Sequence, residues 1–300
     1  MDRQKPLRVS SVGRRGLVLN DGGGSELPAR AAGRVFSTKS PVPGDLVRAR
    51  REGGTLLVES VLPRRNTLTR ADRKGDARVV AANVDLVMAV MSVAEPPFAA
   101  GLLDRILAAA EYDRLKALVV LNKTDLYGEE DAEGPGGALL ADYRAAGYRC
   151  RPVSCRSGEG VEEIMDLMSG RVVMMAGPSG SGKTSIARHL RPDLDLQVGE
   201  VSPRTARGRH TTTSSRLIPL GPDTFLMDTP GVAGYAIDHI PPEELGGCFP
   251  EIAALQDDCR FRDCYHDSEP GCAVREAVES EQLSGARYES YLELLRRVRE

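Results

Sequence analysis

Residues 172–185 read Val172-Val173-Met174-Met175-Ala176-Gly177-Pro178-Ser179-Gly180-Ser181-Gly182-Lys183-Thr184-Ser185, an apolar run followed by a glycine-rich loop. The stretch from Gly177 to Thr184 matches the phosphate-loop pattern GxxxxGK[ST] in full. Backbone N–H groups of such a loop surround the phosphates of a nucleotide, and the positive end of the following helix points at them. Lys183 is then expected to contact the β and γ phosphates and the Thr184 hydroxyl to bind Mg²⁺. The fixed offsets after an apolar run disfavour an ordinary glycine-rich turn.

A second polar motif, Asn122-Lys123-Thr124-Asp125, follows the apolar run at 118–121. The Asp125 carboxylate is suited to accept hydrogen bonds from the ring N1–H and the exocyclic amine of guanine. Adenine lacks that amine and would leave a carboxylate unpaired, so the motif selects guanine. Asn122 is expected to bridge to the phosphate loop, and the stem of Lys123 to cover the base. A polar turn at the end of a strand is the alternative for these four residues taken alone.

A third loop and two switch motifs extend this nucleotide site. Ser154 and Cys155 resemble the loop that meets guanine through backbone N–H groups, with Cys155 where alanine is usual; an ordinary loop is the alternative. Asp228-Thr229-Pro230-Gly231 is a DxxG element. Its Asp228 is expected on the Mg²⁺ shell, usually through water, and the Gly231 N–H on the γ-phosphate. A plain Pro-Gly turn is its alternative.

Residues near the DxxG element bear on the rate of hydrolysis. Among Thr211, Thr212 and Thr213 we favour Thr212 as the threonine that closes on Mg²⁺, although a polar loop explains the run equally well. His210 is a candidate for positioning water or has a structural role. Val232 follows the DxxG element and has no polar group to orient water, where Ras-like enzymes hold a glutamine. We therefore expect slow intrinsic turnover that a partner stimulates.

Cysteines near the C-terminus form a second candidate site. The residues Cys259, Cys264, His266 and Cys272 give the spacing C-x4-C-x-H-x5-C. Three thiolates and one imidazole suit a closed tetrahedral Zn²⁺ site, which leaves no open position and is therefore structural. Free buried cysteines are the alternative.

Composition and charge describe the rest of the chain. The 300 residues carry a net charge of −3, but residues 1–75 hold 16 Lys/Arg and 7 Asp/Glu, a balance of +9, so the remainder carries −12. A basic N-terminal segment indicates a polyanionic partner, or else a solvated surface.

The same N-terminal segment has short apolar stretches with turn residues between them. This pattern predicts a small β-barrel, for which an OB-fold fits the size. No apolar run approaches the length of a membrane span and no signal peptide is evident, so we expect a cytoplasmic protein.

The order of the motifs is the most specific feature. The base-reading motif and the Ser154 loop come first, then the phosphate loop, the threonines and DxxG, whereas ordinary GTPases begin with the phosphate loop. This circularly permuted order, an N-terminal barrel and the Cys/His spacing resemble the ribosome small-subunit-dependent GTPase A family (RsgA type). The segments 208–213 and Pro63-Arg64-Arg65-Asn66 also resemble that family. The resemblance covers nearly the whole chain.

This resemblance implies a multi-domain fold: an OB-fold RNA-binding barrel at 1–75, a circularly permuted P-loop α/β GTPase domain at 76–240, and a helical zinc-binding domain at 241–300. It implies late maturation of the 30S subunit, contact with 16S rRNA, and hydrolysis of GTP to GDP, with Mg²⁺, that the 30S particle stimulates. We expect a monomer. Two rival hypotheses are an RNA-binding assembly placeholder, in which nucleotide only sets conformation, and a P-loop ATPase or kinase, against which Asp125 argues.

Overall fold

The computed structural model describes residues 5–13, 16–33, 35, 40–71, 77–127, 136–192, 215–228, 237 and 239–300. Three predicted site residues, His210, Thr212 and Gly231, lie outside them. The chain divides into two compact units, each described by itself below. Unit 1 comprises Met1–Leu86, Glu163–Met175 and Thr184–Gly231, and unit 2 comprises Val87–Glu162, Ala176–Lys183 and Val232–Glu300.

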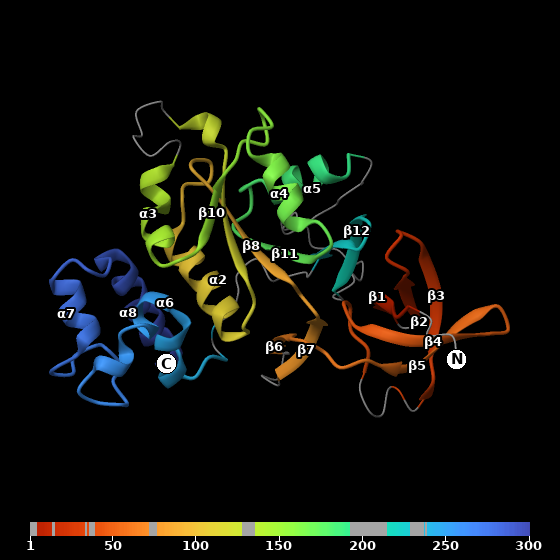
Figure 1. Ribbon diagram of the computed structural model, residues 1–300, viewed down its shortest axis with the longest axis horizontal. Helices are drawn as coiled ribbons and strands as arrows, with labels where there is room; N and C mark the ends of the chain where they lie inside the picture. Colours follow the sequence, from red (N-terminus) through yellow and green to blue (C-terminus); the bar gives the residue numbers. More distant parts are fainter. Residues whose placement is uncertain are drawn as a thin grey trace, which may run out of the picture. The chain divides into compact units, whose positions relative to one another are not determined.

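The N-terminal part of unit 1 is a closed five-stranded barrel (Figure 1). Its strands are β1 (Leu7–Gly13), β2 (Gly16–Asn20), β3 (Glu26–Ala31), β4 (Leu46–Glu52) and β5 (Thr55–Val61). Around the barrel the order is β1-β2-β3-β5-β4, with β3 and β5 parallel and β4 closing onto β1. Seven buried residues form its core: Val9, Leu17, Leu19, Ala29, Val35, Val47 and Val58. The predicted OB-type barrel is confirmed, and its closure leaves none of the five strands with a free edge.

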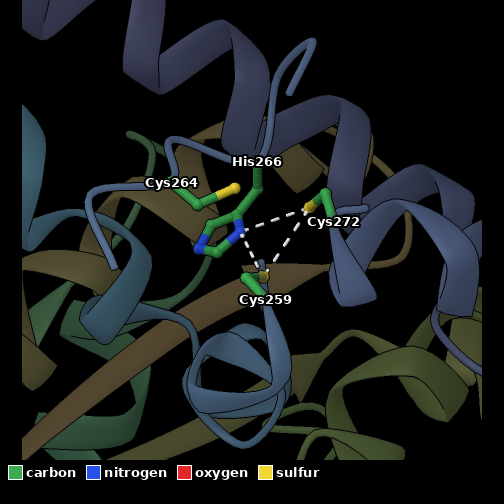
Figure 2. A group of neighbouring side chains, drawn as sticks. All are labelled: Cys259, Cys264, His266 and Cys272. Atoms are coloured by element: carbon green, nitrogen blue, oxygen red, sulfur yellow. Dashed lines mark hydrogen bonds between the residues drawn. The ribbon is translucent and has the colours of Figure 1, made fainter. Parts of the chain in front are cut away.

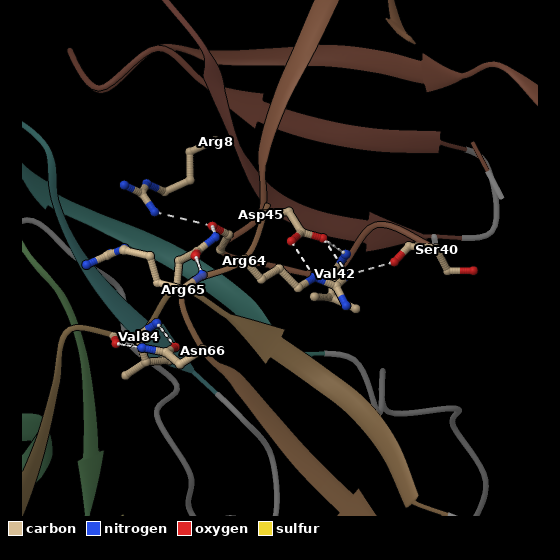
Figure 3. A network of polar contacts seen from close by, with 10 residues as sticks. Arg8, Ser40, Val42, Asp45, Arg64, Arg65, Asn66 and Val84 are labelled. Carbon is tan, nitrogen blue, oxygen red and sulfur yellow. Dashed lines mark hydrogen bonds and ion pairs between the residues drawn. The ribbon is translucent and has the colours of Figure 1, made fainter. Parts of the chain in front are cut away.

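A polar network connects the barrel to the chain that leaves it (Figure 3). Arg64 donates two hydrogen bonds to the carboxylate of Asp45, at 2.7 and 2.8 Å, and Asp45 is fully buried. The Asn66 side chain exchanges two hydrogen bonds with the backbone of Val84, at 2.8 and 2.9 Å. These contacts flank the hairpin β6 (Thr67–Ala71) and β7 (Ala77–Ala82). The segment Pro63 to Asn66 therefore has a structural role at this junction.

Three further strands of unit 1 continue the sheet from β1. They are β11 (Val172–Ala176), β12 (Arg216–Gly221) and β13 (Thr224–Asp228). Strand β12 pairs antiparallel with both β1 and β13, and β13 runs parallel to β11. Since the carboxyl ends of parallel strands share one edge, the segment after β11 and Asp228 at the end of β13 leave the sheet at the same edge.

Unit 2 contains a parallel sheet and most of the helices. Strand β9 (Ala117–Asn122) lies between β8 (Leu86–Ser92) and β10 (Arg149–Pro152), and all three are parallel. Every residue of β8 is buried, as expected for a strand covered on both faces. The helices are α2 (Ala100–Tyr112), α3 (Gly137–Ala145), α6 (Pro250–Ala253), α7 (Ala273–Glu279) and α8 (Gly285–Arg299), with 3-10 turns at Thr124–Leu126, Pro242–Glu244, Gly246–Cys248 and Gln256–Asp258.

Two more helices, α4 (Val161–Met168) and α5 (Lys183–Leu190), each begin in unit 2 and continue into unit 1. The C-terminal region after Ile240 is helical, as predicted, and α8 contacts α2 of the same unit. Among the described residues, no helix combines the length and the apolar character that a bilayer crossing requires.

Candidate nucleotide and metal sites

The phosphate loop follows β11 and leads into α5, as its motif predicts. Two of its glycines are required by the space around them. Gly177 has φ +142°, and a Cβ there would lie 2.0 Å from the Val90 carbonyl oxygen. Gly182 has φ +100°, and its Cβ would lie 1.9 Å from Nδ2 of Asn122. Side chains at either position would displace neighbouring atoms of the site, so the sequence keeps glycine where the backbone passes closest.

Lys183 closes this loop on itself. Its Nζ donates to the carbonyl oxygens of Gly177 and Pro178, at 2.9 and 2.7 Å. Burial lowers the pKa of the Lys183 ammonium, because desolvation disfavours the charged form. A phosphate placed in the loop would supply a negative counter-charge to this half-buried ammonium. The hydroxyl of Ser181 is buried in the same loop without a hydrogen-bond partner among the described residues. Both observations fit an anionic ligand.

Asn122 joins the base-reading motif to the phosphate loop. Its Nδ2 donates to the carbonyl oxygen of Ser181 at 2.9 Å, and its Oδ1 accepts from the backbone N–H of Cys155 at 3.2 Å. The asparagine is only 2% exposed, so both bonds form away from water. The predicted bridge is therefore present, and one side chain ties together three loops that lie far apart in the sequence.

The carboxylate of Asp125 is held from the third loop. Oγ of Ser154 donates to Oδ1 of Asp125 at 2.7 Å, and Ser154 is fully buried. The guanidinium of Arg156 lies 3.8 Å from Oδ2. The thiol of Cys155 has its pKa raised, first by burial and further by the Asp125 charge, so it stays a neutral thiol beside this site. The Asp125 side chain is 22% exposed, which leaves an acceptor for a base.

Lys123 and the turn after β8 form another wall of the site. Lys123 has φ +63°, and its Nζ donates to the carbonyl oxygen of Glu95. Pro96 lies 3.3 Å from the position that a Cβ on Gly180 would take, so the same turn also contacts the phosphate loop. Sequence reasoning missed this turn, since no motif marks it.

The residues expected around Mg²⁺ belong to unit 1. Thr184 is half-buried in the first turn of α5, and Asp228 ends β13. A hydroxyl and a carboxylate are the hard oxygen ligands that Mg²⁺ prefers, so their donor set fits that ion. The Nε atom of Arg216 lies 3.4 Å from Oδ2 of Asp228. Sequence reasoning missed Arg216, because only the strand pairing brings it to the DxxG aspartate.

The four predicted zinc ligands converge at the C-terminal helices (Figure 2). Their ligand atoms all lie within 4.8 Å of one another. The Nδ1 atom of His266 is 3.5 Å from Sγ of both Cys259 and Cys272, and the two Sγ atoms are 3.9 Å apart. Tetrahedral zinc with ordinary bond lengths requires about 3.6 Å between S and N and about 3.8 Å between two S atoms. The Sγ atom of Cys264 lies within 4.8 Å of the other three ligand atoms, so the set fits a closed zinc site.

Helix α8 and one carboxylate hold the loop of this cluster. The hydroxyls of Tyr288 and Tyr291 donate to the carbonyl oxygens of His266 and Tyr265, at 2.6 and 2.8 Å. Glu269 accepts hydrogen bonds from three backbone N–H groups of the same loop. A cavity of about 750 Å³ adjoins the cluster, and its lining includes several charged side chains. The cluster is thus fixed by backbone contacts as well as by its spacing.

A family profile described as RsgA GTPase matches residues 61–238. The chain belongs to the RsgA GTPase family. Two relatives of this family carry the name small ribosomal subunit biogenesis GTPase RsgA. The protein from Azotobacter vinelandii is 41% identical over 256 residues, which cover 85% of this chain and 74% of the relative. That from Bacteroides fragilis is 36% identical over 264 residues, covering 87% and 85%.

Solved structures agree on the fold of this RsgA-family chain. The crystal structure of YjeQ from Thermotoga maritima matches with a TM-score of 0.82 and 31% identity, covering 98% of each chain. YloQ, described as a circularly permuted GTPase, matches with a TM-score of 0.77 and 26% identity, covering 100% of this chain and 97% of the other. The predicted circular permutation is thereby confirmed.

Proposed function

We propose that this RsgA-family chain binds and hydrolyses GTP, with Mg²⁺, during maturation of the small ribosomal subunit. The observation that carries the proposal is the guanine-reading arrangement. Ser154 holds the Asp125 carboxylate, and Asn122 ties the same loop to the phosphate loop. A site that offers a carboxylate to N1–H and the 2-amino group favours guanine and leaves a charge unpaired with adenine.

Each residue of the phosphate side then has a role. Backbone N–H groups between Gly177 and Ser185, except at Pro178, which has none, bind the phosphates, and Lys183 exchanges its loop carbonyls for phosphate oxygens. Thr184 and Asp228 are the residues that would hold Mg²⁺. The ion would supply positive charge against the negative charge that develops on the phosphate oxygens during hydrolysis. Thr212, His210 and Gly231 complete the proposed switch, as the sequence indicates.

The partner proposed for this site is the 30S subunit with its 16S rRNA. Relatives from two bacteria are named for small ribosomal subunit biogenesis. In residues 1–75, Lys and Arg outnumber Asp and Glu, which supports a polyanion as the partner of the barrel. Val232 offers no side chain to orient the attacking water, which supports slow turnover until the partner completes the site. We propose that the protein acts in the cytoplasm, in keeping with a ribosomal partner, and that it acts as a monomer.

We further propose that the four ligands hold one structural Zn²⁺. Cys259, Cys264 and Cys272 supply thiolates, and His266 supplies Nδ1. Zinc bound there would fix the loop between α6 and α8 without an open position for chemistry. The division into a barrel at 1–75, a GTPase domain at 76–240 and a zinc domain at 241–300 remains our proposal for the domain organisation.

The proposal is tested at Asp125. An Asp125→Asn side chain cannot accept from both guanine N–H groups, and its amide suits xanthine, which has an oxygen in place of the 2-amino group. Loss of two charge-assisted hydrogen bonds predicts about 10²- to 10⁴-fold weaker binding of GTP, with tighter binding of xanthosine triphosphate. Asp166→Asn, on the exposed face of α4, is the control and should bind GTP normally. An Asp125→Asn protein that still prefers GTP would overturn the assignment of the base site.

A second variant distinguishes a GTPase whose nucleotide binding is required from an RNA-binding assembly placeholder. Lys183→Ala should lose nucleotide binding and with it the ability to support subunit maturation, scored as the restoration of 30S particles in cells that lack the native protein. Maturation that proceeds normally with Lys183→Ala would favour the RNA-binding placeholder instead.

A further inference from the structure

Three strands of unit 1 place a barrel residue, an arginine and the DxxG aspartate in one row across the sheet. Ser11 of β1 pairs with Arg216 of β12, and Arg216 pairs with Asp228 of β13. The Arg216 side chain also reaches the carboxylate, since its Nε lies 3.4 Å from Oδ2 of Asp228. A cation held by the strand next to the barrel therefore faces the carboxylate that we assign to Mg²⁺.

We propose that Arg216 is a built-in counter-ion that competes with Mg²⁺ for Asp228 and so sets the magnesium requirement for holding nucleotide. This inference rests on the proposed function, because it requires Asp228 at the metal site. Arg216 is a positioning residue that acts through the aspartate to which it is ion-paired.

Two physical effects of Arg216 both weaken the binding of Mg²⁺ near Asp228. The guanidinium occupies an oxygen of Asp228 that would otherwise face the metal or its water, so Mg²⁺ binding must displace or reorient it. The arginine also places a positive charge close to a divalent cation, and their repulsion weakens metal binding. Both effects vanish when the side chain becomes neutral, so removal of the charge should tighten the hold on Mg²⁺.

The size of the effect follows from exposure. The side chains of Arg216 and Asp228 are 53% and 25% exposed. Ion pairs of that kind are worth only about 0.2–1 kcal/mol, because water and salt screen them. The change in magnesium requirement should therefore be about 1.4- to fivefold. It should shrink at about 1 M salt, where the screening length falls to about 3 Å.

Arg216 lies on the strand between the barrel and β13. Strand β12 is the only described strand that joins the barrel to β13, through its single register pair with β1. The strand that carries Arg216 is therefore paired directly with β1 of the barrel. The counter-ion thus lies where the barrel and the magnesium aspartate meet.

The test measures how free Mg²⁺ controls the dissociation of a fluorescent GDP, N-methylanthraniloyl-GDP, from the full-length protein. Arg216→Gln should reach half-maximal retention at about 1.4- to fivefold lower Mg²⁺ than the native protein. That ratio should approach one at about 1 M NaCl. Arg216→Lys keeps the charge and should resemble the native protein.

Arg50→Gln is the matched control. Arg50 is 51% exposed and ion-paired like Arg216, but its partners Glu52 and Glu59 lie in the barrel. Its magnesium requirement should equal that of the native protein. An Arg216→Gln protein with an unchanged or increased requirement overturns the inference, as does an equal shift in Arg216→Lys. If the native protein retains GDP without any dependence on Mg²⁺, the proposed role of Asp228 fails as well, so the two failures are distinguishable.

Discussion

Arg287 anchors α8 in the interior of unit 2, and its replacement gives a prediction of defined size. The side chain is 3% exposed and donates to Asp104 of α2 and to Glu251 of α6, the latter at 2.7 Å. Its guanidinium also lies 4.7 Å from the ring centroid of Phe249 and 5.2 Å from that of Tyr143. Burial by itself would lower the pKa of Arg287. The negative charges of Asp104 and Glu251 outweigh that effect, so the pKa is raised.

Arg287→Met keeps an apolar stem of similar length and removes the charge. Asp104 is 2% exposed and Glu251 16%, so the variant leaves one fully buried carboxylate without its cation. Removal of one partner from a buried ion pair costs about 3–5 kcal/mol, to which lost cation–π contacts add about 0.5–2 kcal/mol. We therefore expect the free energy of unfolding of unit 2 to fall by at least about 3 kcal/mol.

Urea unfolding followed by near-ultraviolet circular dichroism measures this loss. The chain has no tryptophan, so the signal comes mainly from tyrosines, of which Tyr143 and Tyr148 contact Arg287. Arg296→Met, at an exposed position of the same helix, is the control and should change stability by less than about 0.5 kcal/mol. Adding Asp104→Asn to Arg287→Met should restore part of the loss, because the most deeply buried carboxylate, that of Asp104, is then no longer left as an unpaired charge. A loss below about 1 kcal/mol would refute the assigned role of the buried pair.

Three other predictions follow from local geometry. Gly182→Ala should abolish binding of fluorescent GDP, since its Cβ would lie 1.9 Å from Asn122, whereas Gly101→Ala, with nothing within 4 Å, should bind normally; equal affinities would contradict the loop geometry. Elemental analysis should find one zinc per chain, lost in Cys259→Ser together with thermal stability and retained in Cys150→Ser; a metal-free native protein of full stability would exclude a structural zinc. Burial raises the pKa of Asp113 to about 6, above its unfolded value of about 3.9, so the native state holds the proton more tightly. The free energy of unfolding should therefore decline as the pH rises from about 4 to about 6, and this decline should be smaller in Asp113→Asn; parallel pH profiles for the two proteins would show that Asp113 does not titrate there.

The sequence predicted those parts of the site whose chemistry fixes the spacing of residues. A phosphate loop needs Gly177, Lys183 and Thr184 at set offsets, and a tetrahedral metal needs four ligands within reach of one another. The permuted order of the motifs was also readable, because each motif identifies itself. The barrel was predicted only as a class, since short apolar stretches indicate strands but carry no information on which strands pair.

Contacts between distant residues were not predictable from the sequence. Arg287 and Asp104 are separated by 183 positions, and nothing in either local sequence marks the other as its partner. Arg216 meets Asp228 only because the antiparallel register of β12 and β13 places them opposite each other, and a shift by one residue would turn the arginine to the other face. Ser154 was found through its likeness to a known loop, but its hydrogen bond to Asp125 required the fold.

Hydrolysis of GTP by this chain should respond to the small ribosomal subunit. Phosphate release from GTP is measured with and without purified 30S subunits, with ATP as the control substrate. We expect slow release from GTP alone, strong stimulation by 30S subunits, and no comparable release from ATP. Release from GTP that 30S subunits leave unchanged would contradict the proposed partner, and equal release from ATP would contradict the guanine site built on Asp125.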